Sequence, residues 1–379
     1  MWKTSTILVF FVLCLMIFGI VMLASTSGIK AQAIYGDPQY FVKRQILWGI
    51  LAFIVGIIAC RVDYHRWRFF AVPIFGLAII LLALVFVPDI GVKIGGSRRW
   101  LHFGSFGLQP SEFAKFALIL IMAWWMAREQ RHATDFMRGA LLPGGVMIIA
   151  AGLIFLEPDF GTTLLVAAVG MTIMYAGGAR IIYLLLFTIS GLSVFTLAVM
   201  RDSIRLHRSL AFLDPDKYSQ TYSFQLVNAI NAFIAGGMSG AGLGQSIQKQ
   251  YYLPEAHTDF IFAIIGEELG VFATVAVVIL FAGIFFCGLK ISYRAPDVFG
   301  RLLAFGITIM ITLQAAINIG VVTGCLPTKG LPLPFISFGG SSLIMTMLEI
   351  GVLINIAQHE QDPVKHNDVK IIKDRVHRF

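Results

Sequence analysis

The sequence predicts an all-α polytopic membrane protein with about ten transmembrane helices and both termini in the cytoplasm. Of its 379 residues, 58% are hydrophobic and only 13% are charged, and the mean hydropathy is +0.82. A soluble domain of this length would need more charge to cover its surface. The apolar residues form long blocks near 20 residues instead of amphipathic stripes, and that length crosses a bilayer.

Ten blocks are predicted to span the membrane. The first is interpreted as a retained signal anchor, because it is long and lacks a small-residue cleavage site. The fifth and sixth are separated by only four residues, which predicts a tight helical hairpin. The predicted spans are 6–27, 45–60, 69–87, 113–126, 139–156, 161–177, 181–200, 259–289, 302–322 and 341–358.

Basic residues predict the orientation of these spans. With the N-terminus inside, Lys and Arg are more than twice as dense in the predicted cytoplasmic segments as in the outer ones, as the positive-inside rule requires. The net charge of +8 therefore reflects topology and not nucleic-acid binding. The domain prediction is one transmembrane domain, 1–358, with a large outer loop, 201–258, and a basic cytoplasmic tail, 359–379. Chemistry in an outer loop has no ATP, so its substrate must carry its own activation.

Ionisable residues inside or at the ends of spans are candidates for function, because burying charge in hydrocarbon is costly. Glu112 and Lys115 are three residues apart after a Pro-Ser helix start, so they share a face. They form a structural ion pair, line an outward cavity, or do both. Asp259 lies where the long outer loop meets a span, and partial burial there suits a general base. From position alone, capping of the helix by Thr258 or Asp259 is the better interpretation.

Other charged residues suggest further roles. Glu267 and Glu268 point about 100° apart on a helix, so we expect at least one to bond a neighbouring helix instead of forming a matched acid–base pair. Arg98 and Arg99 in an outer loop are suited to phosphate, although a solvated loop is an equal alternative. Lys329 lies in the segment 326–342, whose three prolines and three glycines predict non-helical backbone packed on protein or a wet cavity.

Several long runs resemble the SEDS family (shape, elongation, division and sporulation) of bacterial peptidoglycan polymerases. They are GxGLGxSxxK at 240–249, LPEAHTDFIFAIIGEELG at 253–270 and LPTKGLPLPFISFGGSS at 326–342. GSRRWL at 96–101, QPSEFAK at 109–115 and EPDFGTT at 157–163 are similar as well. The resemblance covers nearly the whole chain and is greater to the division branch than to the elongation branch. Phe338 stands where the family commonly has tyrosine.

The resemblance implies an extracytoplasmic glycosyltransferase that polymerises lipid II into β-1,4 glycan strands and releases undecaprenyl pyrophosphate. The family's essential loop aspartate falls on Asp259, and its cavity acid and lysine fall on Glu112 and Lys115. Lys115, Arg98, Arg99 and Lys329 are the candidates for binding pyrophosphate, and a divalent cation, Mg or Mn, is a candidate cofactor with no ligands assigned. The lipid tails require a membrane-facing groove.

The resemblance also implies a location and partners. The chain is expected in the bacterial cytoplasmic (inner) membrane, as a multi-pass protein at the division septum. Its expected partners are lipid II, a class B penicillin-binding protein with transpeptidase activity and other divisome proteins, and no nucleic acid. Two alternatives to the enzyme are a lipid II flippase and a division scaffold without chemistry of its own.

Overall fold

The computed structural model describes residues 3–88, 90–94, 97–103, 106–201, 203–215, 217–218, 220–221, 223–250 and 253–359. The predicted tail lies outside these residues apart from its first residue. The helices and strands are α1 (Thr4–Tyr35), α2 (Tyr40–Arg61), α3 (Tyr64–Leu84), β1 (Gly91–Ile94), β2 (Ser97–Phe103), β3 (Phe106–Leu108), α4 (Pro110–Arg128), η1 (Gln130–His132), η2 (Phe136–Leu141), α5 (Leu142–Leu156), α6 (Phe160–Ala176), α7 (Ile181–Arg201), α8 (Ser203–Leu213), α9 (Phe224–Gly236), α10 (Ile261–Arg294), α11 (Val298–Val322) and α12 (Gly340–Gln358).

The predicted spans are confirmed as helices. Within the described residues, nine helices are long and apolar enough to cross a membrane, and the shorter α6 is the remaining predicted span. The predicted hairpin is present, because α5 ends at Leu156 and α6 begins at Phe160. The main departure is α1, whose 32 residues extend about 48 Å at 1.5 Å per residue. That exceeds a hydrocarbon core of about 30 Å, so one end of α1 reaches the layer of loops.

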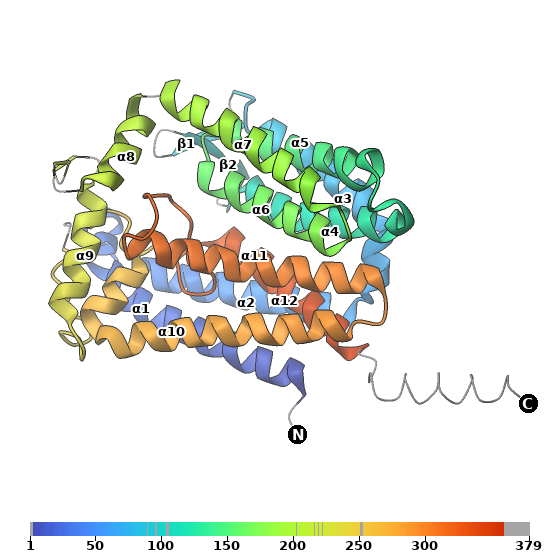
Figure 1. The fold of residues 1–379 in the computed structure, drawn as a ribbon. Coiled ribbons are helices and arrows are strands. Elements are labelled where there is room, and N and C mark those ends of the chain that lie inside the picture. Colours follow the sequence, from blue (N-terminus) through green and yellow to red (C-terminus); the bar gives the residue numbers. More distant parts are fainter. Residues whose placement is uncertain are drawn as a thin grey trace, which may run out of the picture.

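The spanning helices lie side by side, and the polar segments gather at one end of the bundle. Figure 1 shows α1 beginning and α12 ending at the right, whereas the sheet, α8 and α9 lie at the left, which we call the loop end. Both ends of the described chain are therefore on one side, as an even number of spans requires. The assignment of that side to the cytoplasm stays a prediction.

Burial identifies the centre of the bundle. In α4, 78% of the most apolar window is buried, whereas the values are 17% in α3 and 6% in α7. Helix α4 is thus central, and α7 presents apolar side chains where lipid would lie. Helices α2 and α12 pack closely through glycines: a Cβ on Gly351 would lie 2.3 Å from the carbonyl oxygen of Gly56. Such small-residue contacts are typical of helix packing in membranes.

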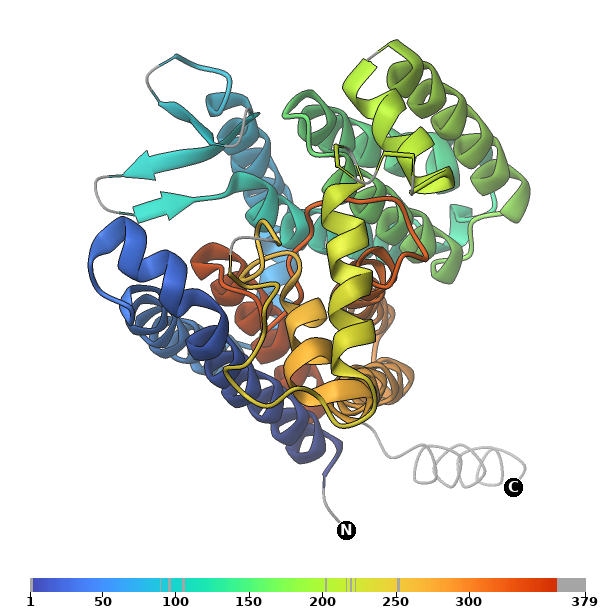
Figure 2. The same cartoon turned by 90° about the vertical axis from the view of Figure 1, so that its left-hand side faces the viewer.

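Two features of the loop end differ from an all-helical expectation. Strands β1, β2 and β3 form a small antiparallel sheet in the order β1-β2-β3 where the sequence analysis expected only an outer loop. Helix α9 runs across the ends of the spanning helices (Figures 1 and 2) instead of crossing the membrane with them. The fold remains predominantly helical, and the sheet and α9 lie at the loop end beside the segments that carry the candidate site.

The long eighth span is broken at Gly270. This residue has φ 74° and ψ −170° inside α10, a conformation that is essentially restricted to glycine. A Cβ there would also lie 2.4 Å from the carbonyl oxygen of Met238. The break separates a short segment, 261–269, from the membrane-spanning remainder of α10, where the sequence analysis expected one continuous helix.

We predict that Gly270→Ala destabilises the protein by about 1–3 kcal/mol, the cost of holding a non-glycine residue in this backbone conformation. The clash with Met238 adds to that cost. Thermal unfolding of purified protein in detergent would show a lower midpoint. Gly76→Ala in α3 is the matched control, because nothing lies within 4 Å of its added Cβ. Equal midpoints for the two variants would contradict the account of the break.

Candidate active site

Asp259 does not cap the helix that follows it. The N-cap position of α10 is Phe260, and the structure shows no side-chain hydrogen bond to that helix end. Asp259 is partly exposed instead of fully buried. A Cβ on Gly330 would lie 2.7 Å from its Oδ2 atom, so the carboxylate faces the backbone of the proline-rich segment. The capping interpretation, favoured from position alone, is therefore wrong.

The backbone around Asp259 is held from outside its own loop. The carbonyl of His257 accepts a hydrogen bond from the backbone N–H of Phe338 at 3.1 Å. The next carbonyl, of Thr258, accepts from the hydroxyl of Ser337 at 2.6 Å. Three successive carbonyls are held in this way, because that of Asp259 also accepts a hydrogen bond, from an α11 side chain described next.

Two amides on α11 connect the loops to the bundle. Asn318 Nδ2 donates to the carbonyl of Asp259 at 2.7 Å and to that of Leu331 at 2.6 Å. One turn earlier, Gln314 donates to the carbonyl of Pro332 at 2.8 Å. The predicted non-helical backbone of the proline-rich segment is confirmed, and α11 satisfies two of its carbonyls.

A cavity of about 150 Å³ lies beside this arrangement at the loop end, lined by Arg99, Asp159, Lys329 and Gly330 among others. Arg99 comes from β2. Its guanidinium donates to the carbonyl of Pro158 at 2.6 Å and lies 3.9 Å from the carboxylate of Asp159. The structure thus brings two predicted phosphate-binding residues, Arg99 and Lys329, close to Asp259.

Burial changes the acid–base properties of this site. It raises the pKa of Asp259 to about 7, with the negative charges of Glu255 and Asp159 adding to the effect and Arg99 opposing it. It lowers the pKa of Lys329 to about 8, against the attraction of Asp159. Near neutral pH, Asp259 is therefore poised to gain or lose a proton while Lys329 is mostly cationic.

Glu157 is a third acid near the cavity. Its side chain is 1% exposed, and neither carboxylate oxygen has a hydrogen-bond partner among the described residues. Burial and the charge of Asp159 raise its pKa to about 8, although Arg99 opposes this. A carboxyl group with this pKa is mostly protonated near neutral pH, so Glu157 adds little negative charge beside Arg99 and Asp159.

The predicted pair Glu112 and Lys115 lies elsewhere. Their charged atoms are 2.8 Å apart, with side chains 3% and 5% exposed, which confirms the expected ion pair. They line a separate cavity of about 10 Å³, roughly the space of one water molecule. Lys115 also donates to Gln314 at 2.7 Å, so the pair is connected to the proline-rich segment. A second acid, Glu349 of α12, lines the same cavity.

Arg98 is separated from the cavity. It is exposed on β2, and successive residues of a strand point to opposite faces. Arg99 therefore faces the site and Arg98 does not line it.

An apolar groove of about 570 Å³ adjoins the cavity. It is lined by residues of α5, α6 and α7 and by two residues of α11, Leu313 and Ile317. Phe195 lines both the groove and the polar cavity. A charged space and an apolar space are thus continuous at this residue.

The described residues contain no group of three His, Cys, Asp or Glu side chains arranged to hold a metal ion. Near the cavity they offer the carboxylates of Asp259 and Asp159. Two carboxylates are too few for a metal site built from protein alone, but one or two carboxylates together with a substrate's phosphates commonly hold Mg²⁺.

Comparison with known proteins identifies the family. The model of the FtsW/RodA/SpoVE family, described as cell cycle protein, matches residues 5–362. A probable peptidoglycan glycosyltransferase FtsW from Trichlorobacter lovleyi is 40% identical over 93% of this chain and 92% of its own length. Stage V sporulation protein E from Bacillus subtilis is 37% identical over 95% of this chain and 99% of its own.

The chain belongs to the FtsW/RodA/SpoVE family. The SEDS resemblance, stronger to the division branch, FtsW, than to the elongation branch, RodA, is thereby confirmed. Among solved structures, a chain of a peptidoglycan synthase complex that coordinates polymerization and crosslinking is similar, with a TM-score of 0.74 and 27% identity over 94% of this chain and 98% of that one. RodA from Thermus thermophilus gives a TM-score of 0.69 at 25% identity, covering 94% and 97% of the two chains.

Sequence reasoning missed several polar residues at this FtsW-type site. In the sequence, Asp159 stands out only as part of a family motif, and Gln314, Asn318 and Glu349 lie within predicted apolar spans. The available signal was their position, because polar side chains at membrane depth are costly and generally have partners. Gln314 and Asn318 are also four residues apart, which places them on one helix face.

We predict that Asn318→Ala loosens the site. It leaves the carbonyls of Asp259 and Leu331 without a donor, and each such loss costs about 1–3 kcal/mol. Amide hydrogen exchange over 331–338 should accelerate, and the midpoint of thermal unfolding should fall. Thr323→Ala at the C-cap of α11 is the control, because among the described residues its exposed hydroxyl bonds only the carbonyls of the preceding turn and Cys325. Unchanged exchange in Asn318→Ala would contradict this role.

Proposed function

We propose that this chain polymerises lipid II at the loop end of its bundle, with Asp259 as catalytic base. The chain is an enzyme of the FtsW type, a peptidoglycan glycosyltransferase. The observation that supports the site is the partly buried Asp259 carboxylate, whose pKa is raised to about 7, beside a cavity with two cations. A base with a pKa near the working pH is the most effective proton acceptor.

The chemistry follows from the substrate's own leaving group. A hydroxyl oxygen of one lipid-linked disaccharide attacks the anomeric carbon of another. The bond from that carbon to the pyrophosphate oxygen breaks, and the pyrophosphate leaves with the electron pair. Asp259 takes the hydroxyl proton. Single displacement at an α-linked donor inverts the centre and gives a β-1,4 linkage, and no nucleotide is required.

Arg99 and Lys329 stabilise the departing pyrophosphate. Both line the cavity, and they come from different elements, so they can contact the two phosphates from different sides. Fixed cations aimed at developing negative charge contribute strongly to catalysis.

The pair Glu112 and Lys115 has a supporting role in this proposal, because it contacts the proline-rich segment through Gln314. Arg98 is exposed and does not line the cavity, so this proposal gives it no direct contact with the leaving pyrophosphate. A divalent ion, if bound, would be held by Asp159 and the substrate's phosphates, because Asp259 must stay free to accept the proton.

The apolar groove accommodates a lipid tail. Its lining from α5, α6 and α7 is almost entirely apolar, and Phe195 places it next to the cations that would hold the pyrophosphate. A polyprenyl chain could therefore remain in an apolar environment while its headgroup reacts. This arrangement supports a lipid-linked substrate over a soluble sugar.

The chain is an integral membrane protein, and its family places it in the inner membrane. We propose the septum as its location, in keeping with its FtsW relatives. The similarity to a chain of a peptidoglycan synthase complex supports a partner that crosslinks the new strands. A class B penicillin-binding protein with transpeptidase activity is the proposed partner.

Asp259→Asn should reduce glycan synthesis from lipid II by about 10²–10⁴-fold, the usual contribution of a general base. The amide keeps the shape of the side chain but cannot accept the proton. The measurement is the yield and length of glycan strands made by the purified full-length protein, with folding checked by gel filtration.

Asp37→Asn is the control for this variant, because the Asp37 side chain is 39% exposed and forms an ion pair with Lys43. The Asp37→Asn protein should make glycan strands at the normal rate. Normal polymer yield from Asp259→Asn would refute the catalytic role. Movement of lipid II across vesicles without any polymer from the wild-type protein would favour the flippase alternative.

A further inference from the structure

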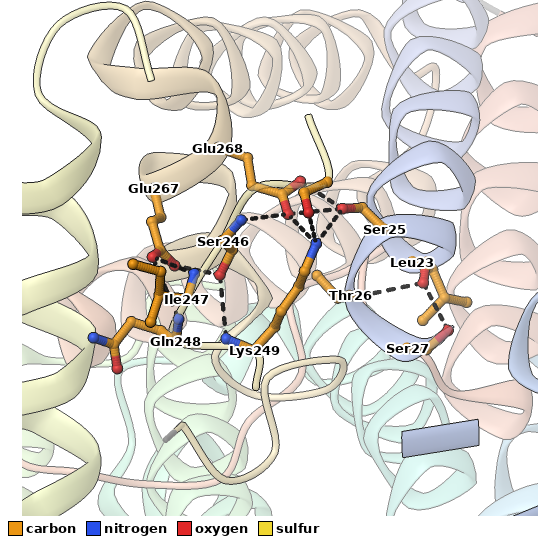
Figure 3. Close-up of polar contacts among 11 residues, drawn as sticks. Leu23, Ser25, Thr26, Ser27, Ser246, Ile247, Gln248, Lys249, Glu267 and Glu268 are labelled. Carbon is orange, nitrogen blue, oxygen red and sulfur yellow. Dashed lines mark hydrogen bonds and ion pairs between the residues drawn. The ribbon is translucent and has the colours of Figure 1, made fainter. Parts of the chain in front are cut away.

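A buried ion pair joins the long loop to α10 and α1 away from the cavity. Lys249 Nζ lies 2.7 Å from Glu268 Oε1, and the two side chains are 5% and 0% exposed. Ser25 of α1 places its hydroxyl 2.7 and 2.6 Å from the two oxygens of Glu268. Figure 3 shows the three side chains converging from separate elements. The expected bond from this acid pair to a neighbouring helix is therefore present.

The neighbouring acid holds the same loop. Glu267 accepts hydrogen bonds from the hydroxyl of Ser246 and from the backbone N–H of Ile247, the latter at 2.8 Å (Figure 3). The backbone carbonyls of Glu267 and Glu268 accept from the N–H groups of Ala241 and Gly242, both at 2.9 Å. The side chains and backbone carbonyls of both acids thus hold residues 241–249 against the short first segment of α10.

This fastening lies close to Asp259 along the chain. Residues 241–249 are held against the first segment of α10, and Asp259 lies two residues before that helix begins at Ile261. Because α10 is broken at Gly270, helical geometry alone does not fix the segment 261–269 to the rest of the helix. Residues 241–249 and the segment 261–269 are thus bonded to each other, and Ser25 connects them to α1. A second contact from α1 supports this, since Lys30 lies 3.5 Å from Glu255, four residues before Asp259.

We propose that the Lys249–Glu268 pair, held on α1 by Ser25, is a positioning clamp that sets the orientation of Asp259 for glycosyl transfer. None of these three residues touches the cavity, so they act through the backbone. Buried ion pairs are poor sources of net stability but can specify one arrangement among several. Small misplacements of a reacting group cost about 10²-fold in rate. This inference rests on the proposed function of Asp259.

The test compares Lys249→Met with Lys43→Met in the purified full-length protein. Lys43 also lies 2.7 Å from its acid partner, Asp37, but the pair is exposed. We expect Lys249→Met to lower kcat by about 10²-fold with little change in the KM for lipid II, whereas Lys43→Met keeps wild-type kinetics. Ser25→Ala keeps the ion pair but detaches it from α1, and should give a smaller loss of kcat.

A second variant separates positioning from loss of folding. Lys249→Met leaves a buried charge without a partner, which is itself destabilising, whereas Lys249→Met with Glu268→Gln removes both charges and relieves that penalty. We expect this double variant to fold and still to show reduced kcat at unchanged KM. Wild-type kcat in the folded double variant would overturn the clamp.

Amide hydrogen exchange provides a readout that does not depend on activity. In the double variant, exchange over residues 253–260 should accelerate, and unchanged exchange there would overturn the clamp. Failure of the proposed function would instead appear as an inactive wild-type protein, or as an active Asp259→Asn.

Discussion

The site depends on one constraint: backbone that leaves the helical pattern near the bilayer must find hydrogen-bond partners within the protein. The proline-rich segment and the loop before α10 meet that need largely through each other. Phe338 and Ser337 hold the two carbonyls before Asp259, and Asn318 holds the third together with that of Leu331. The position of Asp259 is therefore a consequence of satisfying polar backbone.

That position also determines the chemistry available. Withdrawal from water and nearby negative charge raise the pKa of Asp259, whereas Arg99 limits the rise. The same small region contains Asp259, the cations Arg99 and Lys329 and, past Phe195, an apolar groove; in the proposed function they are the proton acceptor, the partners of the leaving group and the site of the lipid tail. The buried pair Lys249–Glu268 lies outside the cavity and acts on Asp259 through the loop backbone in the proposed clamp. The bundle thus places an apolar groove next to a polar cavity.

The spans and the family could be predicted from the sequence, because long apolar blocks and continuous motifs are local signals. The contacts that build the site could not. Ser25 and Glu268 are 243 residues apart, and no local pattern pairs them. The strands around Arg99 are short, and the positive φ of Gly270 leaves no trace in hydropathy. For Asp259, position alone predicts a helix cap, and only the family resemblance predicts catalysis.

The most direct test of the central claim is the pH dependence of the polymerisation rate. A base must be deprotonated to act, so the rate should fall as the pH drops through the raised pKa of Asp259, about 7. Glu255→Gln removes a neighbouring negative charge that raises this pKa, and it should shift the fall to lower pH. A fall near the ordinary aspartate pKa of about 4, unmoved by Glu255→Gln, would contradict the account.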